Sequence, residues 1–176
     1  MSSSLKAFFN VTIGFLPLIL LWSIEGKIGL VLGFVCVLML LIKGIINKNI
    51  GIMSRVLLAY FSISNIIYFY LNIDSVLQHK YLTSYIVLAL TGFISIMLGK
   101  PYTMYEARSG YDKEFGKSPL FIEVNILITK IWTVIYLINV MIQLTGHNIM
   151  TVVIMNMILV IGIILSITIP GAFPEV

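Results

Sequence analysis

The side chains able to do acid–base chemistry are few in this sequence and stand apart from one another. Glu106, Glu123 and Lys130 are the candidates for a membrane-embedded enzyme acting on lipid. None of them belongs to a paired acid–base or metal-binding constellation. The motifs GxSxG, HExxH and GxGxxG and the P-loop are absent from the sequence. The sequence therefore favours a non-enzymatic protein with no catalytic residue and no cofactor.

Residues that bind metals or haem are equally sparse. His79 and His147 lie in polar stretches between apolar runs, where two isolated histidines make a poor metal or haem site. Cys36 is the single cysteine, which excludes an intramolecular disulfide and a cysteine-based zinc cluster. We predict surface histidines, a core or lipid-facing cysteine and no bound metal.

A richer pattern is a stripe of amides and amphipathic rings along one apolar segment. Its members fall within about 40° of one direction on a helix with 100° per residue. They are Asn125, Trp132, Tyr136, Asn139 and Gln143. Interhelical hydrogen bonds in a bundle core, worth about 0.6 kcal/mol each, are the interpretation we favour. The alternative is a polar path or groove, as in a channel or transporter for small solutes or lipids.

An earlier segment offers a possible partner face for this stripe. Phe61, Asn65, Tyr68 and Asn72 follow helical spacing there, and Asn10 and Asn156 add one amide each from two further segments. If these groups converge with the stripe, the core holds a cluster of amides and phenols. Such a cluster suits a polar headgroup or small solute, but it holds no group for acid–base catalysis near neutral pH.

Membrane-spanning helices are the elements that must position these residues. Hydrophobic residues make up 60% of the 176-residue chain and charged residues 10%, whereas a soluble domain is about a quarter charged. A spanning helix needs about 20 mostly apolar residues, and its backbone groups must be satisfied within it. We expect one transmembrane domain over residues 1–176, an all-α bundle of six spans. The spans are 7–23, 28–46, 56–71, 81–98, 122–144 and 150–169.

The basic residues predict how this bundle is oriented. The N-terminal tail, the second loop and the fourth loop together hold eight lysines and arginines, whereas the opposite loops hold Lys27 and Lys80 alone. Cytoplasmic loops collect basic residues, so both termini are predicted to be cytoplasmic. The positions of these residues between apolar runs argue against nucleic-acid binding, despite the net charge of +4.

Lys130 is the one charge with a candidate position deep in the bilayer. A span that starts at Leu120 places it near the midplane, where an ionisable group marks a function. A span from Ile126 to Leu144 still crosses about 28 Å and lets the lysine snorkel to the cytoplasmic surface. We favour snorkelling, because Glu123 and Asn125 are typical of the interface. On either placement Lys130 points away from the stripe.

Two stripes of small residues predict close helix packing. Gly29 and Gly33 form a GxxxG pair, and the second stripe comprises Ser84, Leu88, Thr91, Ser95 and Gly99. Small residues let helices approach closely in lipid. We favour packing within one chain over the alternative, the interface of a homo-oligomer.

The polar segment 99–119 is the longest connection and the candidate partner loop. It carries Lys100, Tyr102, Tyr105, Glu106 and Arg108. Rings mixed with charges suit a short helix lying on the headgroups or a docking surface for a protein. An inert connector stays open as an alternative, although the segment is longer than a turn requires.

Three short motifs resemble the intracellular septation proteins, small polytopic proteins of the bacterial inner membrane, and their relatives. Phe15-Leu-Pro-Leu18 lies in the first span, Lys100-Pro101 follows the fourth, and Asn125 and Asn139 stand fourteen residues apart in the fifth. The resemblance implies a role in envelope maintenance or septation through contacts with membrane lipids and other membrane proteins. It carries over no catalytic residue.

Overall fold

The structure is a bundle of long helices. In a computed structural model, the described residues are 3–48, 50–108, 114–146 and 148–172, and throughout these ranges the regular structure is helical. The six longest helices are α1 (Ser3–Ser23), α2 (Gly26–Ile46), α3 (Ile52–Asn65), α5 (Lys80–Met97), α7 (Pro119–Leu144) and α8 (Ile149–Gly171). The prediction of an all-α fold is confirmed.

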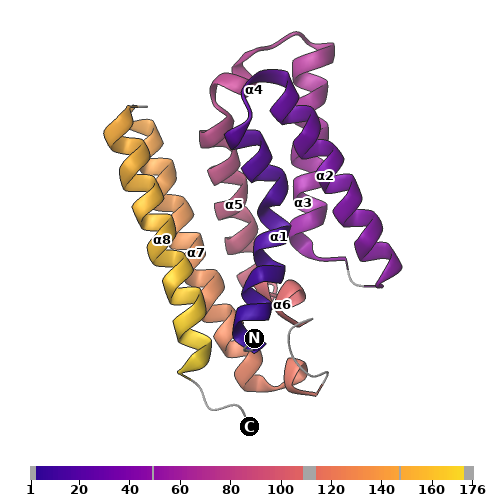
Figure 1. The fold of residues 1–176 in the computed structure, drawn as a ribbon, viewed down its shortest axis with the longest axis vertical. Helices are drawn as coiled ribbons and strands as arrows, with labels where there is room; N and C mark the ends of the chain where they lie inside the picture. The colour runs from indigo at the N-terminus through magenta and orange to yellow at the C-terminus, as the bar shows by residue number, and fades with distance from the viewer. Residues whose placement is uncertain (1–2, 49, 109–113, 147, 173–176) are drawn as a thin grey trace.

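These helices alternate in direction along the chain (Figure 1). Helices α1, α3 and α7 rise toward the end that carries the short α4 (Ser75–Gln78), and α2, α5 and α8 return from it. We call this the upper end, and we call the end with α6 (Tyr102–Ala107) the lower end. The start of α1 and the end of α8 both lie at the lower end.

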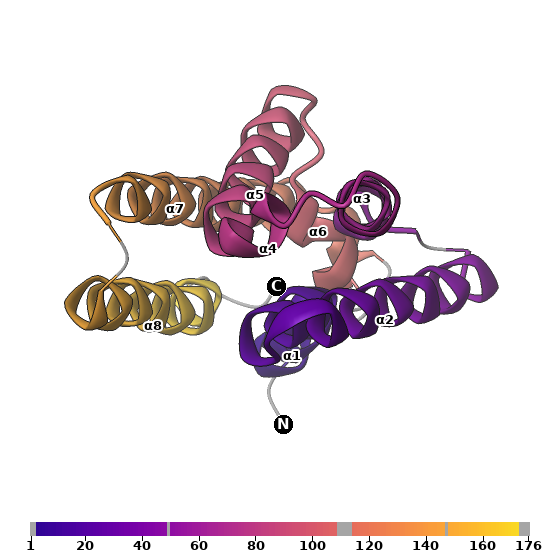
Figure 2. The same ribbon diagram turned by 90° about the horizontal axis from the view of Figure 1, so that it is seen from above.

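Helix α5 occupies the middle of the bundle. Seen from above, it lies between α3 and α7 (Figure 2), and it packs most extensively on α7. Ser84, Leu88, Thr91 and Ser95 of α5 are all buried, and a Cβ on Gly92 would lie 3.2 Å from Thr133 Cβ of α7. The stripe of small residues thus packs within the chain, except for its last member, Gly99, which is exposed beyond the helix.

The GxxxG pair also serves packing within the chain. A Cβ on Gly33 would lie 2.6 Å from Phe61 Cζ of α3 and 2.9 Å from the Pro17 carbonyl oxygen of α1. A Cβ on Gly29 would collide with the Ile24 carbonyl oxygen and lie 3.3 Å from that of Leu20. Since α1 and α3 already occupy this face of α2, the glycine pair packs within the chain, as the favoured interpretation expected.

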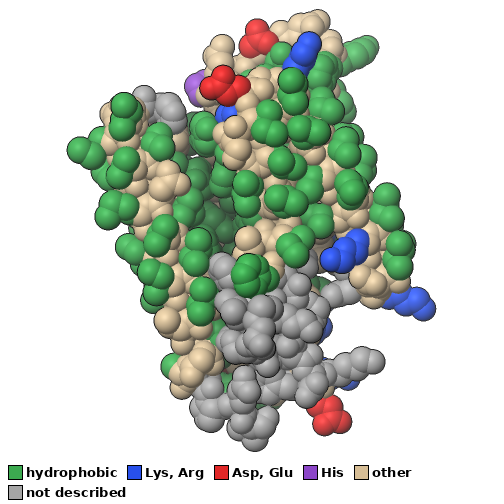
Figure 3. All heavy atoms as spheres, viewed as in Figure 1, with side chains coloured by type: hydrophobic (Ala, Val, Ile, Leu, Met, Phe, Trp, Pro, Cys, Tyr) green, Lys and Arg blue, Asp and Glu red, His purple; other side chains and the backbone are tan. Residues whose placement is uncertain are grey.

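Among the described residues, five helices are long and apolar enough to cross a membrane. They are α2, α3 with its π-helical end Ile66–Tyr70 (η1), α5, α7 and α8. In the part of α1 whose side chains are described, the apolar stretch is Val11–Ser23. Large apolar side chains cover the outside of these helices, and Figure 3 shows them over the middle of the molecule with charged side chains toward its ends. Lipid must cover such a surface, so the chain is a multi-pass membrane protein.

Helix boundaries follow local signals. Ser118 accepts a hydrogen bond from Phe121 N and caps α7, with Pro119 in the first turn, where proline is tolerated. The helix therefore begins three residues before the predicted span 122–144. At the other end of this helix pair, Asn148 and Thr151 form a reciprocal capping box that starts α8.

Candidate functional site

The polar stripe of α7 is buried inside the bundle. Asn125, Tyr136 and Asn139 are each 3% exposed or less, and Trp132 and Gln143 are half-buried. Lys130 is exposed, so it points away from the stripe as predicted. The stripe therefore faces other helices.

Hydrogen bonds join three members of the stripe to neighbouring helices. Trp132 Nε1 donates to Ser166 Oγ of α8 at 2.8 Å, and Gln143 Nε2 donates to Met155 Sδ of α8 at 3.2 Å. The hydroxyl groups of Tyr136 and Tyr102 lie 3.2 Å apart, within hydrogen-bond distance. These bonds attach α8 and α6 to α7, which is what the core interpretation of the stripe requires.

An aromatic cluster continues the stripe toward α1. Phe15 stacks on Trp132 with ring centroids 6.4 Å apart and meets Tyr102 edge-on at 6.2 Å. Trp132 and Tyr136 lie 5.6 Å apart. Offset and edge-on ring pairs stabilise a core beyond their buried area. We refer to Phe15, Tyr102, Trp132 and Tyr136 as the aromatic cluster; it connects α1, α6 and α7.

Helix α6 turns inward, which corrects the sequence-based expectation. Tyr102 and Thr103 are 1% and 2% exposed. Thr103 Oγ1 donates to the Asn125 carbonyl oxygen at 3.2 Å and lies 2.9 Å from Thr129 Oγ1. The prediction that Tyr102 belongs to an exposed partner loop or rests on the headgroups is wrong, because both the ring and the hydroxyl of Tyr102 find partners in the core. Burial raises the pKa of its phenol, which therefore stays protonated and able to donate.

The charged part of segment 99–119 stays on the outside. Lys100, Arg108, Glu114 and Lys117 are exposed, and Tyr105 is half-buried. Arg108 Nε donates to the Gly116 carbonyl oxygen at 3.1 Å, which folds the segment back on itself. The side chain of Glu106 and residues 109–113 lie outside the described residues. The described residues of segment 99–119 thus include a buried anchor, Tyr102 and Thr103, and an exposed basic rim. We use the name basic rim for Lys100, Arg108 and Lys117.

Asn139 differs from the rest of the stripe. It is 0% exposed, and within the described part of the chain neither its Nδ2 nor its Oδ1 has a hydrogen-bond partner. A buried polar group without a partner costs about 1–3 kcal/mol. Asn125, by contrast, donates from Nδ2 to the Phe121 carbonyl oxygen at 2.8 Å. Asn139 is therefore the member of the stripe whose chemistry the fold leaves unused.

The amides of the other helices do not converge on this stripe. Asn65 Nδ2 donates to the Phe61 carbonyl oxygen of its own helix at 2.8 Å, and α5 lies between α3 and α7 (Figure 2). Asn72 lies beyond η1, exposed and with φ 54°, a conformation that asparagine tolerates. Asn156 is exposed on α8. The possible convergence of Asn65, Asn72 and Asn156 with the stripe therefore does not occur, and the side chain of Asn10 lies outside the described residues.

Comparison with known proteins adds no further guide. No family model, no curated protein and no solved structure matches the chain. The function must therefore be argued from the residues themselves.

Sequence reasoning missed a second polar cluster, at the upper end. Lys80 was expected in a loop, but it is the first residue of α5 and is 9% exposed. Its ammonium group donates to the Leu21 carbonyl oxygen at 2.8 Å and lies 3.5 Å from that of Ile24. The last carbonyl groups of a helix lack partners within it and attract cations. Lys80 thus closes the C-terminal end of α1.

Hydroxyl and indole groups complete this upper polar cluster. Trp22 Nε1 donates to Ser84 Oγ at 3.3 Å, and Tyr81 donates to the Trp22 carbonyl oxygen at 3.0 Å. The Tyr60 hydroxyl lies 3.1 Å from those of both Thr83 and Ser84. The cluster ties α1 and α3 to the start of α5. The hydroxyl residues Tyr81, Thr83 and Ser84 after Lys80 were visible in the sequence, but their proximity to Trp22 and Tyr60 was not.

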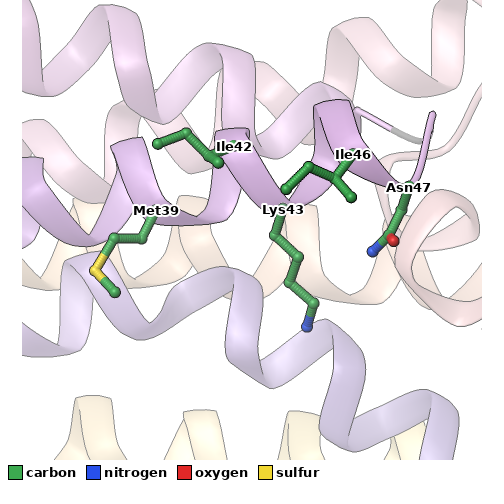
Figure 4. A pocket seen from close by; sticks show the side chains of 5 residues that line it. All are labelled: Met39, Ile42, Lys43, Ile46 and Asn47. Atoms are coloured by element: carbon green, nitrogen blue, oxygen red, sulfur yellow. The ribbon is translucent and has the colours of Figure 1, made fainter.

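One shallow depression lies on α2, away from both clusters (Figure 4). Met39, Ile42, Lys43, Ile46 and Asn47 line it, from the last turns of α2 and its C-cap residue. Its apolar side chains are exposed to the lipid side, so it offers contact area for hydrocarbon rather than a chemical site.

The described residues contain no cluster of three or more His, Cys, Asp or Glu side chains suited to a metal ion. His79 is exposed and Cys36 is half-buried, while His147 is outside the described residues.

Proposed function

We propose that this protein is a non-enzymatic component of the bacterial inner membrane that acts through contacts with other membrane proteins, in envelope maintenance or septation. The observation that carries the proposal is the way α6 is held. Tyr102 and Thr103 are fixed in the core, while Lys100, Arg108 and Lys117 stay exposed beside them. A basic rim on an anchored segment needs little ordering when it binds, which lowers the entropic cost of docking.

The proposal includes six spans, with both termini in the cytoplasm. Helix α1 would be the sixth span, because it runs the height of the bundle beside α2 and α5 and ends in the upper polar cluster. Exposed basic side chains gather on elements of the lower end: Lys43, Lys48, Arg55, Lys100, Arg108 and Lys117. On elements of the upper end, Lys27 is exposed and Lys80 is buried. This asymmetry favours a cytoplasmic lower end.

A second candidate function is transport of a small solute or lipid along the α7 stripe. Asn139 is the observation that favours it, since an unpaired buried amide is unexpected in a merely structural core. The bonds of Trp132, Tyr136 and Gln143 to neighbouring helices weigh against it, because these groups are already engaged. We therefore rank docking above transport.

A photo-crosslinking amino acid at the exposed position 114 tests the docking proposal in growing bacteria. We expect one membrane protein to be captured reproducibly, and we expect Lys100→Glu with Lys117→Glu to weaken capture about tenfold, because like charges would now face an acidic partner. The control is Lys27→Glu, an equally exposed charge on the opposite end, which should leave capture unchanged. The proposal fails if the double variant still captures the protein and fully replaces the wild type in a deletion strain.

A further inference from the structure

The outer face of α8 carries a heptad pattern that packing within the chain does not use. Ile149, Val153, Asn156, Val160, Ile163 and Ile167 follow one another in alternating steps of four and three residues. The first five are exposed, and Ile167 is half-buried. We call this set the α8 seam. Steps of four and three place residues on one stripe of a helix, and they are the pattern by which two helices pack in a coiled coil.

The seam lies away from the face that α8 presents to its own bundle. Met155, Gly162 and Ser166 are the buried residues of α8; Met155 meets Gln143, and Ser166 meets Trp132. At 100° per residue these three positions lie about a third of a turn from the seam. The seam is therefore accessible while α8 remains attached to α7.

Asn156 is the unusual member of the seam. Its Nδ2 donates to the Val152 carbonyl oxygen of its own helix at 2.8 Å, which leaves a second N–H and the carbonyl oxygen of the amide for other partners. It lies seven residues after the start of α8, about 10 Å along the helix, and so falls within a hydrocarbon layer of about 30 Å. A polar side chain facing lipid at this depth is unfavourable unless another protein group pairs with it.

We infer that the α8 seam is the interface with a second copy of this chain. Two copies inserted in the same orientation hold Asn156 at the same depth, and an amide is both donor and acceptor, so a twofold axis along the membrane normal pairs the residue with itself. A single asparagine in an otherwise apolar seam fixes the register in which the two helices pack. Because α1 and α3 already cover the glycine pair of α2, we do not assign the interface between copies to that pair.

Dissociation of labelled protein in liposomes, followed by energy transfer, measures this association. We expect Asn156→Leu to weaken it about tenfold, since interhelical amide bonds are worth that order in lipid. Adding Val160→Asn to Asn156→Leu returns an amide to the seam and should restore association. Adding Met157→Asn instead places the amide about 100° away and should not. Val160 and Met157 are 53% and 62% exposed, so neither change disturbs the internal packing.

A second measurement keeps the inference testable if an amide variant folds poorly. In a Cys36→Ser background, Val160→Cys should form a disulfide between two copies, whereas the adjacent and equally exposed Ile161→Cys should not. Unchanged dissociation of Asn156→Leu, rescue by Met157→Asn as well as by Val160→Asn, or equal crosslinking at 160 and 161 would overturn the inference. None of these outcomes bears on partner capture at position 114, so the two proposals succeed or fail separately.

Discussion

Two asparagines on the same face of α7 show how differently one residue type is used. The side chain of Asn125 donates to the carbonyl group of Phe121, one turn earlier. The Asn125 backbone carbonyl group accepts a hydrogen bond from Thr103 Oγ1 of α6. Asn139, fourteen residues later, is equally buried but unpaired in the described structure. Helical spacing places both amides on one face, but it does not show whether a hydrogen-bond partner lies opposite each of them. The two residues should therefore respond in opposite ways to replacement.

Asn139→Leu should stabilise the protein. Leucine branches at Cγ as asparagine does and has no polar group to bury, so we expect the free energy of unfolding to rise by about 1–3 kcal/mol, the cost of an unpaired buried amide. Unfolding in mixed detergent micelles, followed by circular dichroism, measures the change. Asn125→Leu is the control and should destabilise. If Asn139→Leu were instead destabilising and abolished solute flux in liposomes, the transport function would replace the docking proposal.

At the scale of elements, close contacts at glycine decide how α1, α2 and α3 fit together. Gly33 lets α2 lie against the Phe61 ring and the backbone of Pro17 at once. Helices gain little hydrophobic attraction for one another in lipid, so such contacts carry much of their association. Gly14 of α1 is also buried, but a Cβ there would meet nothing within 4 Å. Replacing each glycine by alanine therefore tests helix packing at position 33 and helix propensity at position 14.

Gly33→Ala should destabilise the bundle, while Gly14→Ala should not. The added methyl group at position 33 meets backbone as well as a ring, so we expect a loss of about 1–3 kcal/mol in the free energy of unfolding. At position 14 the same change removes a flexible residue from a helix and should give a gain of up to about 1 kcal/mol. Thermal unfolding of the two variants in the same detergent gives the comparison. Equal effects at both positions would refute the proposed contact of α2 with α1 and α3.

Over the whole molecule, each end of the bundle is tied by its own polar cluster. Lys80, Trp22 and Tyr81 join α1 to α5 at the upper end, and the aromatic cluster with Thr103 joins α6 to α1 and α7 at the lower end. Between them the surface is apolar and suited to lipid. We expect the two ends to lie on opposite sides of a membrane, so residues of one end should share one compartment.

Cysteine labelling tests this arrangement. In a Cys36→Ser background, a membrane-impermeant maleimide added to intact spheroplasts should label Lys27→Cys but not Lys48→Cys or Lys117→Cys; all three side chains are exposed. After permeabilisation all three should react. Labelling of positions 48 and 117 from opposite sides would disprove the six-span topology, and labelling of both from outside would reverse the orientation.

The sequence by itself determined that the chain is helical and embedded in lipid. Runs of about 20 apolar residues leave the backbone no partner except its own helix, and this condition is local, so the helices α2, α5, α7 and α8 begin and end close to the predicted residues. The glycine pair of α2 and the small-residue stripe of α5 were likewise read correctly as packing faces, because their size alone decides how near another helix can come.

Only the tertiary structure decided which polar residues meet. Helical periodicity defines the faces of a helix but not the neighbour that each face receives. The amides of α3 and α7 looked like partners, but α5 lies between them (Figure 2). Tyr102 looked like a surface residue and is buried, while Asn156, which offered a possible amide for a polar core, faces outward. These outcomes depend on contacts between segments far apart in the chain, such as Lys80 with Leu21 and Tyr102 with Tyr136, and no local pattern in the sequence records them.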